Sequence, residues 1–235
     1  MFYWATIYLL RVLFPLFTRF KVKGQERIPR QGSFLLVSNH ISHFDPPVFS
    51  AACPRAIDWA GSEILFRSAI ARFYFARSNV IKVRQYEADA GALRESIRRV
   101  RKGRCVGLFP EGGIRCGEKS VLGSRVHLYE GASIIAMMSG SPILPCLVMG
   151  SDRLYNPRSL LRRPSIWVRF GNPIPVQGEG KEERERLKQE MIRSIRELAE
   201  EWKHEEHPAP EDWPQTPQQR NPKIPPVRRV AVDQI

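Results

Sequence analysis

A histidine and an aspartate five residues apart, His40 and Asp45, have the clearest capacity for chemistry in this 235-residue chain. In one continuous helix a step of five residues turns by about 500°, so the two side chains would point well apart. They can meet only if the chain bends, as it does where a strand ends and a helix begins; the apolar run 34–37 and the prolines 46–47 suit that bend. A carboxylate that holds one imidazole nitrogen leaves the other free to take a proton. The spacing therefore predicts a general base at His40, oriented by Asp45.

A second motif, Phe-Pro-Glu-Gly-Gly at residues 109–113, follows the apolar run 105–108. We expect it at the exit of a strand, the edge where sheets of α/β proteins commonly bind ligands. Gly112 and Gly113 allow backbone shapes barred to other residues and the close approach of a ligand. Glu111 could hydrogen-bond a hydroxyl or position a cationic neighbour. Taken alone, this motif is equally typical of a plain turn.

Together the two motifs resemble the glycerolipid acyltransferase superfamily, whose signature is Asn-His-x4-Asp followed by Phe-Pro-Glu-Gly. Asn39 begins the first match, and the second motif follows about seventy residues later, in the family's order. Two further stretches fit the family's other blocks, at residues 79–84 and 142–145. The resemblance covers residues 33–150, about half of the chain, and implies transfer of a fatty acyl group from a thioester to a hydroxyl.

The resemblance also implies roles for particular residues. His40 would take the proton of the acceptor hydroxyl, which is itself the nucleophile, and Asp45 would fix the imidazole tautomer. The acceptor site would consist of Arg84, Glu111, Gly112, Gly113 and Arg115. The expected acceptor is 1-acyl-glycerol-3-phosphate, giving phosphatidic acid in phospholipid biosynthesis. Acyl-CoA or acyl carrier protein would be the co-substrate, with no bound cofactor.

Two departures from the family bear on the acceptor. Members that act on lysophosphatidic acid often continue Phe-Pro-Glu-Gly with Thr-Arg-Ser, whereas residues 113–115 read Gly-Ile-Arg. The basic residues often found before a later Gly-Ala pair are replaced by Leu-Tyr-Glu at 128–130. A second hypothesis is therefore another lysolipid acceptor, such as a lyso-ornithine lipid or a lysophospholipid.

The net charge of +13 and the pI near 10.1 favour partners that carry negative charge. Nucleic acid, anionic lipid and phosphate-bearing substrates all qualify. A third hypothesis is thus a non-catalytic protein that binds membranes or nucleic acid. The chain shows no recognised nucleic-acid module, and its aromatic residues gather at the amino terminus instead of among the basic ones, so no nucleic-acid partner is expected.

A metal site is not expected either. His43 lies beside the first motif, but no further histidine is near it in the sequence. Zinc and similar ions need three or four such ligands. The four cysteines contain no C-x-x-C pair and are read as reduced thiols.

The amino terminus has the pattern of a helix that lies on a membrane. Residues 1–10 carry no charge and include four aromatic side chains, before Arg11 and Pro15 interrupt the apolar run. A spanning helix needs about 20 apolar residues, so this segment is too short and too broken. Aromatics followed by the basic residues within 19–23 are typical of the membrane interface. We expect 1–23 to form an interfacial membrane helix that holds the protein at the cytoplasmic face of the inner or plasma membrane.

Alternating strand and helix patterns follow from residue 24. Strands are expected at 34–38, 56–60, 79–84, 105–109, 142–149 and 165–170, and helices at 63–76, 90–102, 130–139 and 181–203. This alternation predicts an α/β acyltransferase domain over 24–206, with a central mixed, largely parallel sheet flanked by helices. Residues 207–235 hold seven prolines and few large apolar residues, which predicts a disordered tail.

Overall fold

A central sheet organises the computed structural model, which describes residues 2–68, 72, 73, 75, 77–84, 89–216 and 219. Within these residues seven strands form the sheet in the order β1-β7-β6-β2-β5-β3-β4. All neighbouring strands are parallel except β6 and β7, which are antiparallel. The predicted α/β fold with a mixed, largely parallel sheet is confirmed.

The elements have the following bounds. The strands are β1 (Arg19–Lys23), β2 (Leu35–Ser38), β3 (Ile57–Ser62), β4 (Ile81–Val83), β5 (Cys105–Leu108), β6 (Ile143–Met149) and β7 (Ser165–Phe170). The helices are α1 (Phe2–Phe17), α2 (Asp45–Ala52), α4 (Ala90–Arg101), α5 (Gly131–Ser139), α6 (Pro157–Leu160) and α7 (Gly180–Glu206). Short 3-10 turns include η2 (Glu63–Phe66), η4 (Ser151–Tyr155) and η5 (Pro210–Asp212). The expected helix at 63–76 begins as the turn η2, residues 72, 73 and 75 are helical, and five of its residues lie outside the described part of the chain.

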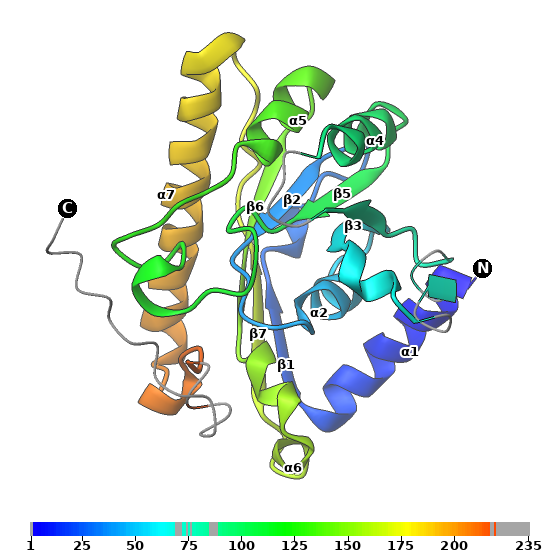
Figure 1. The fold of residues 1–235 in the computed structure, drawn as a ribbon. Helices are drawn as coiled ribbons and strands as arrows, with labels where there is room; N and C mark the ends of the chain where they lie inside the picture. The colour runs from blue at the N-terminus through cyan, green and yellow to red at the C-terminus, as the bar shows by residue number, and fades with distance from the viewer. Residues whose placement is uncertain are drawn as a thin grey trace, which may run out of the picture.

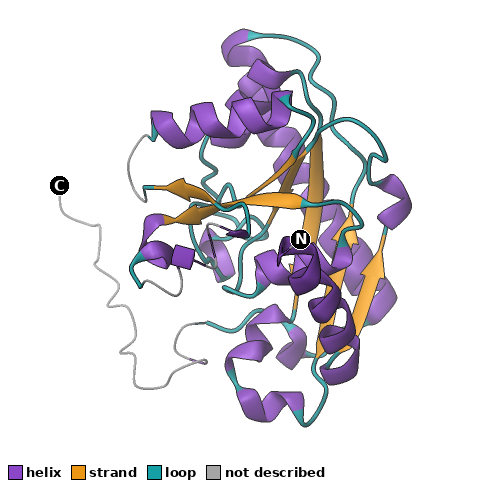
Figure 2. Ribbon diagram, turned by 90° about the vertical axis from the view of Figure 1, so that its right-hand side faces the viewer, coloured by secondary structure: helices purple, strands orange, loops and turns teal. Residues whose placement is uncertain are grey.

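Helices cover both faces of the sheet, so the central strands are apolar on both sides. In β2, Leu35 and Val37 face a core shared with α4, α5 and α7, whereas Leu36 faces a core shared with α1 and α2. Figure 1 shows α7 on one side of the sheet and the pair α1 and α2 on the other, and Figure 2 shows the strands enclosed between helices. The predicted stripe of α7 lies within the first core, all of it buried: Leu187, Met191, Ile195, Leu198 and Trp202.

Five parallel strands end at one edge of the sheet, and the motifs singled out in the sequence follow three of them. His40 follows β2, residues 109–113 follow β5, and Arg84 follows β4. The carboxyl ends of parallel strands share an edge, which is where open α/β sheets bind ligands. The fold therefore gathers the candidate residues on one side of the molecule.

The amino-terminal helix α1 packs on α2 and the sheet by one face only. Tyr3 Oη accepts a hydrogen bond from the backbone N–H of Ile57 at 2.9 Å, and Arg11 Nη2 donates to the carbonyl of Cys53 at 2.7 Å. Arg11 Nε also donates to the Ala51 carbonyl at 3.2 Å, so this arginine holds the carboxyl end of α2. Of the helices within the described residues, none is long and apolar enough to cross a bilayer.

The basic stretch that was expected to continue this helix is a strand instead. Residues 19–23 form β1, an edge strand that pairs in parallel with β7 along all five residues. The helix ends at Phe17, where Thr18 Oγ1 donates to the Phe14 carbonyl at 2.6 Å. Strict alternation of charged and apolar residues across 19–23 explains the strand.

The folded body also extends further at the carboxyl end than expected. Residues 207–216 leave α7 and return along the molecule, because the Trp213 ring packs edge-on against Trp202 with centroids 5.4 Å apart. Arg153 Nη2 donates to the carbonyl of Trp213 at 2.9 Å, which fastens this segment to η4. The remainder of the predicted tail, except residue 219, lies outside the described residues.

Candidate active site

The chain between β2 and α2 makes the bend that the His40 and Asp45 spacing requires. His40 Nδ1 lies 2.8 Å from Asp45 Oδ2, and the side chain of Asp45 is fully buried while that of His40 is 15% exposed. Asp45 is the first residue of α2, where its negative charge is favoured by the helix dipole. This geometry fixes one ring nitrogen and leaves Nε2 as the nitrogen available to a substrate.

Three further donors converge on the Asp45 carboxylate. The backbone N–H groups of Ile41 and Ser42 donate to Oδ2 at 2.8 and 3.0 Å. Ser151 Oγ, in η4, donates to the other oxygen, Oδ1. These donors satisfy the acceptor positions of the buried carboxylate and fix its orientation beside the imidazole. Ser151 was not singled out in the sequence, since only the pairing of β2 with β6 brings it near Asp45.

Asn39 ties the same turn to β6. Its Oδ1 accepts from the Val148 N–H at 2.9 Å, and its Nδ2 donates to the Val148 carbonyl at 2.8 Å. A carboxylate could accept the first bond but could not donate the second, so the side chain must be an amide. Asn39 thus anchors the backbone immediately before His40.

Glu111 lies beneath the His40 backbone. Its Oε2 accepts from the His40 N–H at 2.7 Å, and its Oε1 accepts from the Val121 N–H at 2.5 Å. The side chain is 2% exposed, and burial raises the pKa of its carboxyl to about 7; the charge of Asp45 also raises it, while the two N–H groups lower it. Both oxygens are occupied by the protein itself, which makes Glu111 a support for the His40 backbone.

Aromatic rings fix the plane of the imidazole. The His40 ring stacks on Phe109 with centroids 4.0 Å apart and 13° between planes, and Phe109 stacks in turn on Trp59 at 5.2 Å. The indole Nε1 of Trp59 donates to Ser50 Oγ at 2.9 Å, which locks the base of the stack. The phenylalanine of the second motif therefore positions the histidine of the first.

The two glycines of the second motif have different surroundings. Gly112 has φ +69°, and a Cβ there would lie 2.3 Å from Cε2 of Tyr129. A Cβ at Gly113 would have no atom within 4 Å. Only Gly112 is required by the packing of the loop, while Gly113 borders open space.

The two candidate arginines lie at different distances from His40. Arg115 is in the loop itself, where its backbone N–H donates to the His40 carbonyl at 2.8 Å, and its guanidinium has no hydrogen-bond or ion-pair partner among the described residues. Arg84 is at the end of β4, three strands from β2, or about 14 Å at the usual strand spacing. Its Nε lies 3.7 Å from Asp89 Oδ2, and its side chain is 56% exposed. The structure therefore brings together six of the seven candidate residues and sets Arg84 apart.

The second histidine of the motif belongs to a separate contact. Both the backbone N–H and Nδ1 of His43 are hydrogen-bonded to the hydroxyl of Tyr155, in η4. Within the described residues, no three His, Cys, Asp or Glu side chains lie close enough to form a metal site.

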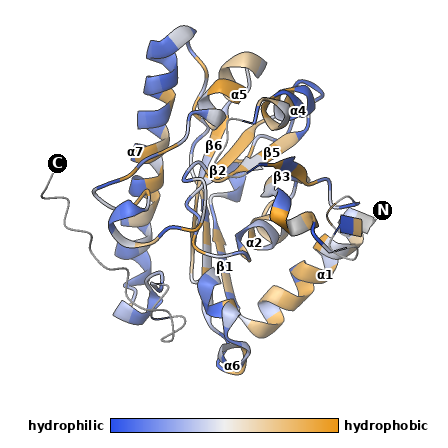
Figure 3. Ribbon diagram, viewed as in Figure 1, coloured by the Kyte–Doolittle hydropathy of each residue, from blue (hydrophilic) through white to orange (hydrophobic). Residues whose placement is uncertain are grey.

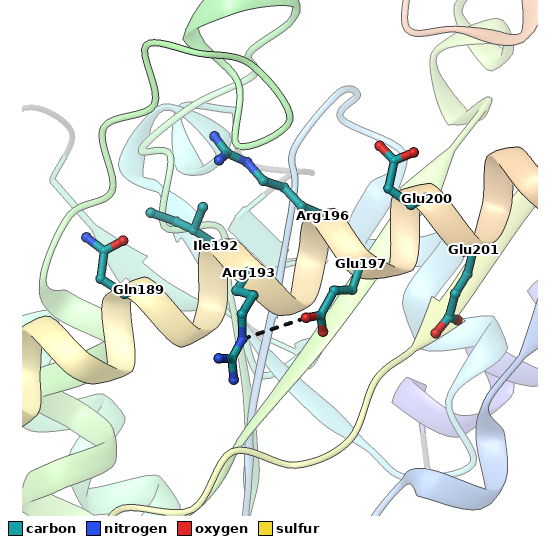
Figure 4. A pocket seen from close by; sticks show the side chains of 7 residues that line it. All are labelled: Gln189, Ile192, Arg193, Arg196, Glu197, Glu200 and Glu201. Carbon is teal, nitrogen blue, oxygen red and sulfur yellow. Dashed lines mark ion pairs between the residues drawn. The ribbon is translucent and has the colours of Figure 1, made fainter.

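One hollow of the described surface lies away from these groups. Its volume is about 610 Å³, and it runs along the outer side of α7. Figure 4 shows the side chains that line it, among them the ion pair of Arg193 and Glu197, 3.7 Å apart. Arg196 in the same hollow donates to the carbonyls of Val121 and Gly123. These are the paired charges of a solvated helix, and we assign no chemistry to them.

Known proteins match this chain over the same region. Residues 19–149 match the family model described as Acyltransferase. The 1-acyl-sn-glycerol-3-phosphate acyltransferase of Borreliella burgdorferi is 29% identical over 138 residues, which are 57% of this chain and 52% of that protein. The 1-acyl-sn-glycerol-3-phosphate acyltransferase of Bacillus subtilis is 22% identical over 166 residues, 70% of this chain and 78% of that protein. The match to the Borreliella protein thus spans about half of its length.

A solved structure has a similar fold. The crystal structure of the 1-acyl-sn-glycerophosphate acyltransferase PlsC from Thermotoga maritima superposes with a TM-score of 0.64. The sequences are 23% identical, and the superposition covers 83% of this chain and 78% of that one. At this level of identity the similarity establishes the fold.

Proposed function

This chain belongs to the acyltransferase family, and from that premise we propose that it transfers a fatty acyl group from acyl-CoA or acyl carrier protein to 1-acyl-glycerol-3-phosphate. The product would be phosphatidic acid. The observation that carries the proposal is the His40 and Asp45 pair, joined at 2.8 Å and supported from below by Glu111. Two relatives that are named for this reaction support the choice of acceptor.

The proposed reaction needs one base and no covalent enzyme intermediate. As the acceptor hydroxyl attacks the thioester carbonyl carbon, its proton passes to His40 Nε2, and Asp45 stabilises the imidazolium. The C–O bond forms, the C–S bond breaks, and the leaving thiolate takes the proton back from the imidazolium. The step consumes one thioester and one alcohol and releases one ester and one thiol. It uses no metal ion or bound cofactor.

Glu111, Phe109 and Ser151 act in this scheme as positioning residues. Glu111 fixes the backbone of His40, Phe109 fixes the plane of its ring, and Ser151 holds the carboxylate of Asp45. General acid–base catalysis contributes about 10²–10⁴ in rate only where the base lies within hydrogen-bond reach of its proton. Loss of any one support is therefore expected to lower turnover without removing the base.

The acceptor phosphate would meet Arg115, whose guanidinium is next to the site, with Arg84 reaching in from β4. Arginine suits this contact because its planar fork binds a phosphate through two parallel hydrogen bonds. A second candidate acceptor is another lysolipid, and the ion pair between Arg84 and Asp89 favours it, since a paired arginine is less available to a phosphate.

We place the reaction at a membrane surface on the cytoplasmic side, where both thioester donors are found. Helix α1 supports this placement through one apolar face that the rest of the described chain leaves uncovered: Trp4, Tyr8, Leu9, Val12, Leu16 and Phe17. Figure 3 shows this helix as a continuous apolar element at the outside of the molecule. Aromatic and aliphatic side chains of this kind favour the boundary between headgroups and acyl chains.

The test is a transfer assay with the purified full-length protein. Labelled acyl-CoA and acyl carrier protein would each be offered with a panel of lysolipids, using wild type, His40→Ala and the matched control His43→Ala. The proposal expects phosphatidic acid from wild type and from His43→Ala, and none from His40→Ala. Wild-type turnover in folded His40→Ala would refute the mechanism. Product from a different lysolipid alone would establish the second acceptor.

A further inference from the structure

The exposed surface formed by α1 continues beyond the end of this helix into the segment 157–164. The loop 161–164, which follows α6, lies against its carboxyl end. Arg163 Nη2 donates to the carbonyls of Pro15 and Thr18, at 2.7 and 3.5 Å, and the Arg19 N–H donates to the carbonyl of Pro164 at 2.9 Å. Figure 1 shows α6 beside the end of α1, at the bottom of the view. Residues 157–164 therefore lie next to α1 and continue the exposed surface that α1 forms.

The side chains of this segment combine one very exposed apolar group with basic ones. Leu161 is 87% exposed, the highest value among the large apolar residues of the described chain. Arg158 and Arg162 are exposed on either side of it, and residues 153–164 contain four arginines and no acidic residue. An aliphatic side chain held out in water between guanidinium groups is costly in solution and is favoured where acyl chains meet anionic headgroups.

The charges around the two arginines are mixed. Arg158 and Arg162 line a hollow of about 440 Å³, together with Arg153, Glu211 and Asp212. Within the described residues neither Arg158 nor Arg162 has a carboxylate partner within 4.0 Å, and Asp212 accepts instead from the N–H of Ala209 at 3.0 Å. The two guanidinium groups are therefore open to an external anion.

We propose that residues 157–164 are a second membrane contact, in which Leu161 enters the bilayer interface and Arg158 and Arg162 bind the phosphates of anionic lipid. This proposal rests on the membrane placement of the proposed function, which involves α1 alone. The segment also continues from η4, whose Ser151 and Tyr155 contact Asp45 and His43. A bilayer bound along α1 and this segment would thus border the mouth of the candidate active site.

Binding of the full-length protein to vesicles tests the proposal. One set of vesicles is phosphatidylcholine alone, and the other is phosphatidylcholine mixed with phosphatidylglycerol. The variants are Arg158→Gln with Arg162→Gln, and Leu161→Ser. The matched control is Arg94→Gln with Lys102→Gln, which removes the same charge from exposed positions on and next to α4. Unchanged far-ultraviolet circular dichroism and melting temperature would show that each variant is folded.

We expect the arginine pair to weaken binding to anionic vesicles by about thirtyfold, since each basic residue near such a surface contributes roughly fivefold. Binding to neutral vesicles is expected to change little, and the control pair should stay near wild type on both. Leu161→Ser is expected to weaken binding to both kinds of vesicle. Three results would overturn the proposal. The arginine pair and its control could lose vesicle binding equally, Leu161→Ser could bind like wild type, or wild type could fail to bind vesicles at all. The proposal would also be overturned if the arginine-pair variant bound vesicles like wild type but retarded a DNA duplex less than wild type in a gel.

Acyl transfer in uncharged detergent micelles separates this proposal from the function it rests on. There the arginine pair and Leu161→Ser are expected to match wild type, because no anionic surface is present. If wild type forms no product with any donor and acceptor, the proposed function fails. The difference in vesicle binding would still decide whether residues 157–164 contact the membrane.

Discussion

Glu111 and His40 are joined through the backbone: the His40 N–H donates to Glu111 Oε2 at 2.7 Å, although the two residues are 71 positions apart in the sequence. The second contact of this carboxylate, to the Val121 N–H, holds the loop that follows. Glu111→Gln leaves one of the two N–H groups facing an amide –NH₂, since only one oxygen remains. An unsatisfied buried donor costs roughly 1–3 kcal/mol, so we expect a lower free energy of unfolding, measured by urea denaturation, together with reduced turnover.

The same residue predicts how stability depends on pH. Burial raises the pKa of the Glu111 carboxyl in the folded protein to about 7, above its ordinary value of 4.5. Between these values the folded protein holds a proton that the unfolded chain releases, so the contribution of Glu111 to stability is full below pH 4.5 and is lost as the pH rises through 7. We expect Glu111→Gln to flatten this part of the pH profile of the free energy of unfolding. An unaltered slope would contradict the assignment.

Ser151→Ala tests the support of the Asp45 carboxylate, the proposed partner of the base. Asp45 keeps three of its four partners in this variant, so turnover is expected to fall by about tenfold or less, against roughly 10²–10⁴ for Asp45→Asn. The matched control is Ser133→Ala, because the buried Ser133 hydroxyl has no hydrogen-bond partner among the described residues. Steady-state rates at saturating substrate would measure the difference. Equal rates for both serine variants would remove Ser151 from the site.

Gly112 and Gly113 form a matched pair for substitution. Gly112→Ala places a methyl group against the Tyr129 ring at a left-handed backbone angle, which costs about 1–2 kcal/mol before the clash is counted. Gly113→Ala meets nothing within 4 Å and is expected to be near neutral for folding. Thermal unfolding of the two variants would compare them directly. A larger loss of stability for Gly113→Ala would mean that the loop has another conformation.

Arg84→Ala separates the two candidate acceptors. If this arginine binds the acceptor phosphate, loss of a charged hydrogen bond worth about 1.5–3 kcal/mol would raise the KM for 1-acyl-glycerol-3-phosphate by roughly 10- to 100-fold with little change in kcat. Lys82→Ala, on the same strand and 59% exposed, is the control. An unchanged KM for Arg84→Ala would favour the second acceptor.

Much of this fold could be predicted from the sequence, and the exceptions have physical reasons. Six strands were expected near their observed places, since buried strands appear as short apolar runs. The sequence predicts a membrane helix over 1–23 because residues 1–10 are aromatic and apolar, although charged and apolar residues alternate across 19–23 as they do in a strand. The prolines of residues 207–216 predict disorder, whereas the Trp213 ring packs on Trp202 and its carbonyl accepts from Arg153, so these residues lie against the folded body.

The candidate site also contains contacts that the sequence predicts and contacts that it does not. Local spacing predicted the contact of His40 with Asp45, because both lie in one turn of chain. Ser151 could not be predicted, since its partner is 106 residues away and a serine after a strand is unremarkable. The role of Glu111 beneath the backbone was also beyond the sequence, which shows an acidic residue but not the direction of its side chain.

Helix α2 begins with Asp45 and ends where Arg11 holds the carbonyls of Ala51 and Cys53. At 1.5 Å per residue, its eight residues span about 12 Å between the Asp45 carboxylate and the contact with helix α1. If α1 binds a bilayer as proposed, any shift of α1 would be passed along α2 to Asp45 and His40. Interfacial activation, a rise in turnover when the enzyme meets a surface, would be the natural kinetic sign of this linkage, and Arg11→Gln should uncouple it.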